Sequence, residues 1–380
     1  MIYLDHAATS FHKPPEVAEA VYHAILNTGN SGRGVHGASL DASRLIYKTR
    51  EKLSQLFNVG DSARVVFTSN ATESLNIAIQ GLLKSGDHCI TTALEHNSVL
   101  RPLYLMEKQG VRLTVVGTDK KGCIDISQIE AAICKESKVI VITHASNVLG
   151  NVTEIEQIGK LCRQYGLLLI LDASQTAGLI PIDMQKLGIS VLCCSGHKSL
   201  LGPQGIGLLC LAEGAIPNPL KVGGTGMDSF SHTMDLPLPT RLEAGTLNTH
   251  GIAGLSAACD YLNHYGQLQI LEEATVLAKR FIAGIQDVPG IALYGDLDAI
   301  VRTPVVALNI RDMDSAEIAD ELFYRFNIAT RAGAHCAPLV HKAFQTEEQG
   351  MVRFSFSHFN TQDEVDEAIQ ALRTLEEETR

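Results

Sequence analysis

The 380-residue sequence contains no tryptophan, and aromatic residues make up only 5% of it. No apolar run approaches the ~20 residues that a bilayer-spanning helix needs, and the first residues lack a basic stretch followed by an apolar core. Long polar low-complexity tracts are also absent. These absences argue against a membrane protein, a secreted precursor and a disordered chain, so we expect a globular protein of the cytoplasm.

Positive charge is scarce as well. The chain has 31 Lys and Arg against 42 Asp and Glu, which gives a formal net charge of −11, and no dense basic cluster stands out. Nucleic acid and anionic membranes bind basic surfaces, so neither is expected as a main partner. The sequence therefore favours a small-molecule ligand.

The nine cysteines form no C-x-x-C pair, and three of them, Cys193, Cys194 and Cys210, lie inside apolar runs. An odd number of scattered cysteines is typical of free thiols in a reducing compartment. We predict neither a disulfide framework nor a metal site.

Between residues 64 and 211 short apolar runs alternate with helical patterns such as 71–84 and 154–165. The runs cover residues 64–68, 88–92, 111–116, 138–143, 167–171, 191–194 and 205–211. Nearly all-apolar strands that alternate with helices predict an α/β fold with a mostly parallel sheet between helices. Ligands of such sheets bind at the carboxyl ends of the strands.

The pattern changes after about residue 250, where longer amphipathic helices and separated strands predict a smaller α+β domain. We predict a large domain over 21–250, a small domain over 251–380 and an N-terminal segment, 1–20, that joins the small domain. Residues 214–245 are rich in Gly, Pro, Ser and Thr and show no period, which predicts a long functional connection.

Lys198 directly follows an apolar strand and precedes a glycine-rich turn, in the run SGHKSLLGPQGIG. It is either a solvated loop lysine or a lysine whose desolvated amine forms a Schiff base with an aldehyde. Asp172 ends another apolar strand and either caps a helix or pairs with the pyridinium nitrogen of pyridoxal phosphate (PLP), which makes that ring an electron sink. Gln175 could donate to the phenolic oxygen of the same cofactor.

Two further strand ends carry polar residues. The run 68–73 leads into a helix, where Asn70 and Glu73 have capping-box spacing and Thr72 adds a hydroxyl. A helix start of this kind is also a phosphate cradle. His96 follows the next strand, and on its own it is an ordinary loop histidine, although it could lie against a cofactor ring.

Further motifs accompany these segments in a fixed order. They are residues 3–10 (YLDHAATS), 33–36 (RGVH), 146–150 (SNVLG), 243–246 (EAGT), 331–336 (RAGAHC) and 352–355 (VRFS). The whole set resembles the class V (fold type I) PLP-dependent aminotransferase superfamily, and most closely its cysteine desulfurase and selenocysteine lyase branch, near the Suf-type group. That resemblance implies a large domain with a seven-stranded sheet.

The resemblance also implies the functional residues. Lys198, Cys336 and His96 would be catalytic. The cofactor would be bound by Lys198, Asp172, Gln175, His96, Ala71, Thr72, Ser195, His197 and Thr246. The substrate would be bound by Asn147, Arg353, Arg331 and His36. Thr246 would reach the cofactor of a neighbouring subunit, which implies a homodimer.

Cys336 lies in a turn-prone loop of small residues, beside His335 and Arg331. It is either one more apolar thiol, as we expect of the other eight cysteines, or a nucleophile whose thiolate these neighbours favour. As a nucleophile it would take sulfur from L-cysteine as a persulfide, leave alanine, and swing with its loop to pass the sulfur to an acceptor protein. Many relatives have T-G-H-H-C where this chain has A-G-A-H-C.

Four functions remain open on the sequence. The first is a cysteine desulfurase, and the second is a selenocysteine lyase acting on L-selenocysteine. A class V aminotransferase or kynureninase-like lyase is third, since neither needs Cys336. A sulfur-carrier or scaffold subunit without PLP chemistry is the fourth, and the presence of Lys198 and Asp172 argues against it.

Overall fold

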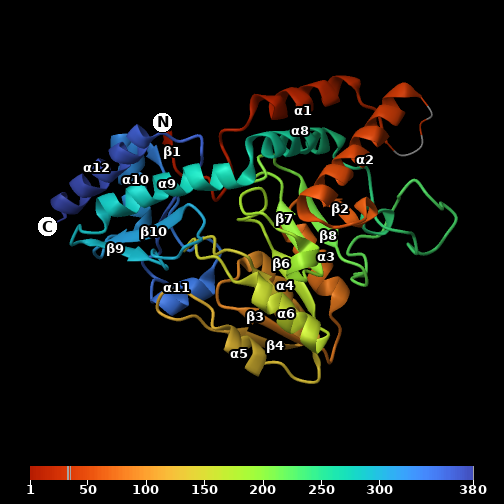
Figure 1. Ribbon diagram of the computed structural model, residues 1–380, viewed down its shortest axis with the longest axis horizontal. Helices are drawn as coiled ribbons and strands as arrows, with labels where there is room; N and C mark the ends of the chain where they lie inside the picture. Colours follow the sequence, from red (N-terminus) through yellow and green to blue (C-terminus); the bar gives the residue numbers. More distant parts are fainter. Residues whose placement is uncertain (32–33, 35, 380) are drawn as a thin grey trace.

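The larger part of the molecule is a seven-stranded sheet between two layers of helices (Figure 1). The computed structural model describes residues 1–31, 34 and 36–379. The strands are β2 (Val65–Thr68), β3 (His88–Thr92), β4 (Arg112–Val116), β5 (Ser137–Thr143), β6 (Leu168–Asp172), β7 (Val191–Ser195) and β8 (Gly207–Leu211). Each predicted apolar run therefore forms a strand, which confirms the α/β prediction.

The strand order is β2-β8-β7-β6-β5-β3-β4. Neighbouring strands are parallel except at β8, which runs antiparallel to β2 and β7. Successive side chains of β5 enter opposite cores: Ile140 and Ile142 lie in one hydrophobic cluster, and Val139 and Val141 in another. Because both faces are covered, every second position cannot be polar, and the strands are apolar throughout.

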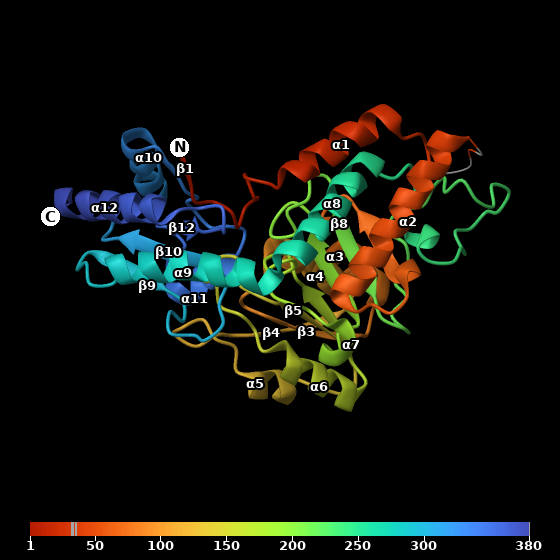
Figure 2. The ribbon, with the colours of Figure 1, turned by 45° about the horizontal axis from the view of Figure 1, so that its top comes forward.

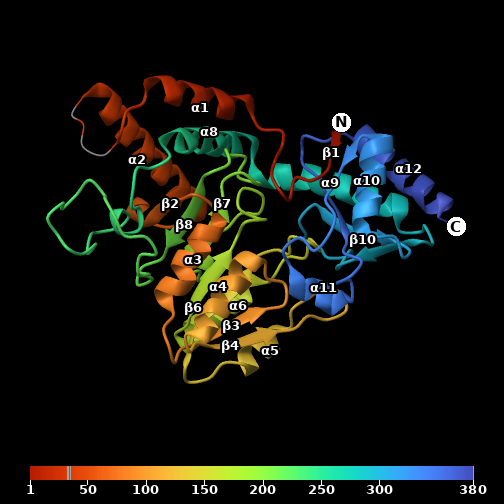
Figure 3. The same cartoon turned by 180° about the vertical axis from the view of Figure 1, so that it is seen from behind.

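Helices from different parts of the chain cover the two faces. One face packs against α2 (Gly37–Phe57), α5 (Ile126–Ala131), α6 (Ile155–Tyr165), α7 (Met184–Leu187) and α8 (Thr249–Tyr265). The other packs against α3 (Ala71–Leu82) and α4 (Asn97–Lys108), which Figure 3 shows from behind. The 3-10 turns η1 (Ser62–Arg64) and η2 (Thr240–Leu242) lie in connections, and residues 212–239 are irregular, as predicted.

The smaller part of the molecule has its own core. A three-stranded antiparallel sheet, in the order β12-β10-β9, packs against helices. Its elements are α9 (Gln267–Ile285), β9 (Ile291–Tyr294), β10 (Val305–Ile310), α10 (Ser315–Phe326), β12 (Val352–Ser355) and α12 (Gln362–Glu378). Between them lie β11 (Ile328–Ala329) and α11 (Pro338–Phe344), and Figure 2 shows this part beside the larger sheet.

The N-terminal segment contacts both parts. β1 (Ile2–Tyr3) pairs in parallel with β11, and Leu4 is buried in the small core. The helix α1 (Pro15–Asn27) instead packs along α8. The buried side chains of α8 belong to the large core, so these contacts continue past the predicted limit at residue 250; the domain limits themselves stay a prediction.

No helix in the described part of the chain is long and apolar enough to cross a membrane. All nine cysteines are free, so the prediction that they form no disulfide framework is confirmed. Our expectation that all except Cys336 are buried is wrong for Cys123 and Cys134, which are half-buried.

Candidate active site

A cavity of about 180 Å³ lies at the carboxyl ends of β5, β6 and β7, beside the first turns of α3 and α4. The predicted residues that line it are Ala71, Thr72, His96, Asn147, Asp172, Gln175, Ser195, His197 and Lys198. They come from five separate segments of the sequence. The parallel sheet brings these segments to one edge, where we expected the ligand site.

Lys198 lies just after β7, with its side chain in the cavity. Among the described residues no hydrogen-bond or ion-pair partner contacts its amine. Desolvation lowers the pKa of Lys198 to about 8, and the nearby charge of Asp172 opposes this shift. The backbone beside it is fixed, because Ser10 Oγ donates to the Lys198 carbonyl oxygen at 2.5 Å. A free amine is therefore available far closer to neutral pH than for an exposed lysine.

Asp172 ends β6 and is 3% exposed. Its Oδ1 accepts hydrogen bonds from the Ser174 backbone N–H (3.0 Å) and hydroxyl (2.5 Å). The other oxygen, Oδ2, has no hydrogen bond within the described chain. The carboxylate therefore closes a turn rather than capping a helix, which was the alternative that we considered, and it still has one oxygen for a cationic ligand.

His96 is the N-cap residue of α4 and accepts the Ser98 backbone N–H at Nδ1 (3.0 Å). Since Nδ1 accepts, the proton of the neutral ring is on Nε2. Desolvation is the main cause that lowers the pKa of His96 to about 4. At neutral pH the ring is uncharged and can lie flat against an aromatic ligand.

The start of α3 forms one wall of the cavity. Asn70 Oδ1 accepts the Glu73 backbone N–H at 3.0 Å, whereas the Glu73 carboxylate accepts the Ser69 N–H at 2.7 Å, so the predicted reciprocal capping box does not form at Asn70. Ala71 N–H points to Ser195 Oγ at 3.4 Å. Helix N–H groups beside hydroxyl side chains suit a phosphate group.

Two predicted cofactor contacts already have partners in the N-terminal segment. Gln175 Nε2 donates to the Ala7 carbonyl oxygen at 3.1 Å. The Nδ1 atom of His197 lies 3.0 Å from Thr9 Oγ1, and burial lowers the pKa of His197 to about 4, so its ring is neutral. Gln175 keeps a second amide N–H group for a ligand, whereas the neutral His197 ring has a single N–H group, which lies on Nε2 where Nδ1 accepts from Thr9.

The sequence reading missed Asp5, Ser10 and Glu95. Asp5 and Ser10 belong to the opening motif, which was a usable signal, but nothing in the sequence shows their distant partners. Glu95 is fully buried and accepts from Thr92 Oγ1 (2.7 Å) and from the Thr143 backbone N–H (3.0 Å). Desolvation raises the pKa of Glu95 to about 8, so it is protonated at neutral pH.

Arg353 lies in β12, next to the cavity but outside its lining, and is 2% exposed. Its Nη2 pairs with Asp5 Oδ1 at 2.6 Å, and its Nη1 donates to the Asn147 carbonyl oxygen at 2.9 Å. Nε has no partner among the described residues. The backbone of Arg353 pairs with that of Arg331, whose side chain is exposed. A buried guanidinium with an unused donor can bind a carboxylate.

Cys336 is exposed, and its neighbours hold its loop by the backbone. The Cys336 carbonyl oxygen accepts the Asn97 N–H at 2.7 Å, and the His335 carbonyl oxygen accepts Asn147 Nδ2 at 2.8 Å. Cys336 and His335 both have positive φ, at 57° and 48°. Asn97 directly follows His96, which lines the cavity, so the backbone of Cys336 lies beside the cavity, although Cys336 is not among its lining residues.

We expected His335 to favour the Cys336 thiolate electrostatically, and this expectation is wrong. Its side chain is 4% exposed, and Nε2 is bonded to the Met351 carbonyl oxygen at 2.9 Å. Desolvation, with the nearby Arg353 charge, lowers the pKa of His335 to about 3. A neutral, buried imidazole cannot supply a positive charge to the Cys336 thiol.

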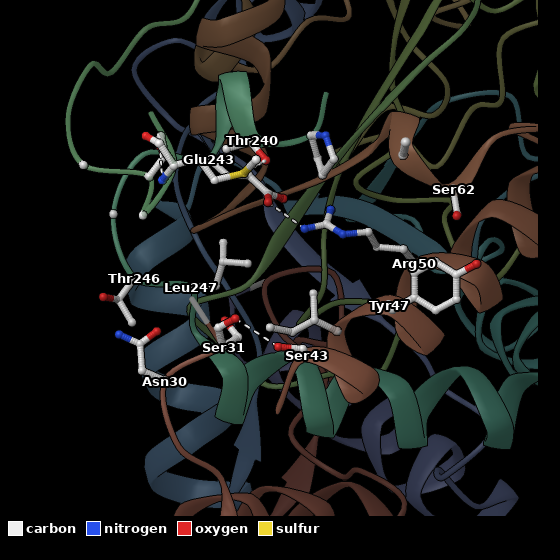
Figure 4. A pocket seen from close by; sticks show the side chains of 18 residues that line it. Asn30, Ser31, Ser43, Tyr47, Arg50, Ser62, Thr240, Glu243, Thr246 and Leu247 are labelled. Carbon is white, nitrogen blue, oxygen red and sulfur yellow. Dashed lines mark hydrogen bonds and ion pairs between the residues drawn. The ribbon is translucent and has the colours of Figure 1, made fainter. Parts of the chain in front are cut away.

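Two predicted site residues lie away from this cavity in the single chain. Thr246 lines a second cavity of about 670 Å³, where the buried Arg50–Glu243 ion pair (2.6 Å) joins α2 to the loop before Thr246 (Figure 4). His36 is the exposed N-cap residue of α2. Arg33 and Val35 of the same motif lie outside the described residues.

Known proteins resemble the chain over its full length. The family model for class-V aminotransferases matches residues 2–368. A probable cysteine desulfurase of Methanothermobacter thermautotrophicus is 33% identical over 99% of this chain and 94% of its own length. The cysteine desulfurase IscS of Vibrio vulnificus is 31% identical over 100% of this chain and 93% of its own.

Solved structures agree with these relatives. The apo structure of a cysteine desulfurase from Thermococcus onnurineus superimposes with a TM-score of 0.92 at 32% identity, covering 99% of this chain and 95% of that one. The cysteine desulfurase CsdA of Escherichia coli gives a TM-score of 0.87 at 28% identity, over 98% and 94% of the two chains. The predicted resemblance is thereby confirmed, and this chain belongs to the class-V aminotransferase family, in which its relatives are cysteine desulfurases.

Proposed function

We propose that this protein is a PLP-dependent cysteine desulfurase that converts L-cysteine to L-alanine and retains the sulfur on Cys336. The observation that carries the proposal is that hydrogen bonds join the Lys198 cavity to the loop of Cys336. Asn97 and Asn147 lie beside or within the lining of the Lys198 cavity, and both donate hydrogen bonds to the loop of Cys336. A plain aminotransferase does not require a thiol at this place.

The residues of the cavity fit PLP. Lys198 offers an unpaired amine to the aldehyde, Asp172 Oδ2 faces no other partner, and the start of α3 offers N–H groups to the phosphate. When bound, this cofactor takes up the electron pair that is released at the substrate carbons. Asp172 would keep the ring nitrogen protonated, and the neutral His96 would cover the ring face.

The other residues act on the substrate. Arg353 would bind the substrate carboxylate, and the Lys198 amine would move protons at the α and β carbons. The Cys336 thiolate attacks the substrate sulfur, so an S–S bond forms while the C–S bond breaks. The electron pair of the broken bond goes to carbon, which takes a proton, and the products are L-alanine and a Cys336 persulfide.

The second cavity and several exposed apolar and aromatic side chains support a homodimer. Tyr22, Leu26 and Tyr47 on α1 and α2, and Phe230 in the irregular connection, are 61%, 63%, 57% and 98% exposed. Large apolar side chains so exposed are typical of an interface. In the dimer, Thr246 would contact the phosphate at the partner's site. Sedimentation of the wild type as a monomer at micromolar concentration would contradict this.

An acceptor protein would collect the sulfur at the exposed Cys336, and the nine free cysteines support a reducing compartment such as the cytoplasm.

Replacement of the nucleophile tests the function. Cys336→Ala should bind PLP normally and lose alanine formation from L-cysteine, at least a hundredfold. Cys134→Ala is the matched control, because this half-buried cysteine lies near the amino end of β5, beside Ser137. The assay measures alanine and, by mass, the sulfur added to Cys336.

L-selenocysteine separates the alternative functions. The weaker C–Se bond lets selenium leave without a thiol, so Cys336→Ala should keep much of any activity on this substrate. A wild type that acts on L-selenocysteine and not on L-cysteine would make the protein a selenocysteine lyase. Full L-cysteine turnover by Cys336→Ala would exclude the persulfide.

A further inference from the structure

Asn147 lies between the two parts of the site that act on the substrate. Its backbone carbonyl oxygen accepts Arg353 Nη1 at 2.9 Å, and its side-chain Nδ2 donates to the His335 carbonyl oxygen at 2.8 Å. Asn147 is 7% exposed and also lines the cavity. One residue thus joins the arginine that binds the carboxylate to the residue before the nucleophile.

The hydrogen-bond partner of the Asn147 side-chain amide determines its orientation. A carbonyl oxygen can only accept a hydrogen bond, so the amide nitrogen of Asn147, and not its oxygen, must face His335. The resemblance assigned Asn147 to the substrate carboxylate. In the structure one of its N–H groups is bonded to the Cys336 loop, and the role of Asn147 toward the substrate stays a prediction.

We propose that Asn147 is a positioning residue for the nucleophile: its side-chain N–H fixes the His335 carbonyl and thereby keeps Cys336 beside the cavity. The need for such a contact follows from the loop itself. His335 and Cys336 both adopt a left-handed backbone conformation, with φ of 48° and 57°, which is unfavourable for residues with a side chain. Contacts from outside the loop must compensate for the free-energy cost of this backbone conformation.

The other hydrogen bonds that hold this loop in the described chain do not involve the carbonyl oxygen of His335. Arg331 pairs with the Arg353 backbone before the turn, and Gly333 exchanges backbone hydrogen bonds with Met351. After the turn, the Asn97 N–H bonds to the Cys336 carbonyl oxygen. Between these points Asn147 supplies the one side-chain donor that the described residues offer to the carbonyl of His335. These contacts describe one position of the loop, and the expectation that the loop swings to pass sulfur to an acceptor stays a prediction.

The experiment compares Asn147→Ala and Asn147→Asp with the wild-type holoenzyme. Both variants remove the donor, and the second nearly keeps the shape of the side chain. Hydrogen–deuterium exchange of the peptide around residues 332–340 should become faster, by roughly three- to tenfold for one lost hydrogen bond. Retained visible absorbance of bound PLP shows that the cavity is intact.

Asn151→Ala is the matched control. Asn151 is 5% exposed and lies in the same connection, but its Nδ2 donates to the carbonyl oxygens of Lys121 and Gly122, away from the Cys336 loop. Exchange in the 332–340 peptide should stay at the wild-type rate in this variant. Equal acceleration in Asn151→Ala would overturn the proposal, because the effect would then be general loosening.

Kinetic measurements are the second part of the test, and they rest on the proposed desulfurase function. Persulfide formation on Cys336 should slow by at least tenfold in Asn147→Ala while KM for L-cysteine stays within about threefold. A raised KM with unchanged exchange would return Asn147 to substrate binding and overturn the proposal. If the wild type forms no persulfide, the desulfurase function fails, and the exchange comparison alone still decides the role of Asn147.

Discussion

The floor of the cavity and the Cys336 loop obtain their chemistry in different ways. Lys198, Asp172 and His96 lie at strand ends of the large sheet, where burial shifts the pKa of Lys198 and His96 toward uncharged forms. Cys336 is exposed, and the backbone carbonyls of its loop accept hydrogen bonds from the Asn97 backbone N–H and from the Asn147 side chain. The reactive charge states in the floor therefore depend on desolvation, whereas the action of Cys336 depends on where its loop is held.

The two regions should therefore respond differently to amino-acid substitutions. A substitution in the floor alters the charge state on which all substrates depend. A change in the loop sequence, such as A-G-A-H-C in place of T-G-H-H-C, leaves the cofactor chemistry intact and alters what the thiol can reach. Differences in acceptor or substrate between relatives should therefore come from the loop.

The largest effect should come from the floor. Lys198→Ala should remove the visible absorbance of bound PLP and abolish turnover of both L-cysteine and L-selenocysteine, because no other cavity residue offers a primary amine. The exposed Lys84→Ala serves as control and should behave as wild type. Turnover by Lys198→Ala at the wild-type rate would show that the cavity is not the site of the reaction.

Asp172→Asn should have the next largest effect. A neutral amide cannot hold a proton on the ring nitrogen, so PLP should remain bound while kcat falls by about a hundredfold or more, which corresponds to ~2.7 kcal/mol. Absorbance and kcat are measured together, with Asp183→Asn at the half-buried N-cap of α7 as control. A kcat near that of the wild type would mean that the floor does not act through this charge.

The sequence predicted the floor well and the loop poorly, for a physical reason. Lys198, Asp172 and His96 each follow a strand, and parallel strands bring such positions together whatever their spacing. The bond from Asn147 to His335 and the ion pair of Asp5 with Arg353 join residues that are 188 and 348 positions apart, and no periodicity encodes them.

His335 shows the same limit for a single residue. The sequence shows a histidine beside a cysteine, from which we expected a cation. Whether the ring is charged depends on burial, and burial by Met351 and the residues around it exists only in the folded chain.

The pH dependence of PLP capture tests the desolvation of the floor. Desolvation lowers the pKa of Lys198 to about 8, so protonated amine predominates below this pH and free amine above it. The rate at which the cofactor-free protein captures PLP should rise about tenfold per pH unit up to about pH 8 and then level off. Absorbance after mixing between pH 6 and pH 10 measures it. A rise that continues up to pH 10 would mean a solvated lysine.

The smallest effect concerns the segment that joins the floor to the loop. Asp5 pairs with Arg353, and Ser10 donates to the Lys198 carbonyl oxygen. Between them His6 is 8% exposed, and neither ring nitrogen has a hydrogen-bond partner within the described chain. Desolvation, with smaller contributions from His12 and His358, lowers the pKa of His6 to about 3.

Protonation of His6 therefore opposes folding. The unfolded chain takes up this proton near pH 6.5 and the folded chain only near pH 3, so the stability is complete above pH 6.5 and decreases as the pH falls toward 3. At pH 5 the loss from His6 is about 2 kcal/mol. His6→Asn removes it, so the drop in unfolding free energy between pH 7.5 and pH 5 should be smaller by that amount than in the wild type. Urea unfolding at the two pH values measures the difference, with the exposed His23→Asn as control. If His6→Asn and the wild type lose the same stability, His6 is solvated, and the segment that joins the two regions is more open than its buried contacts indicate.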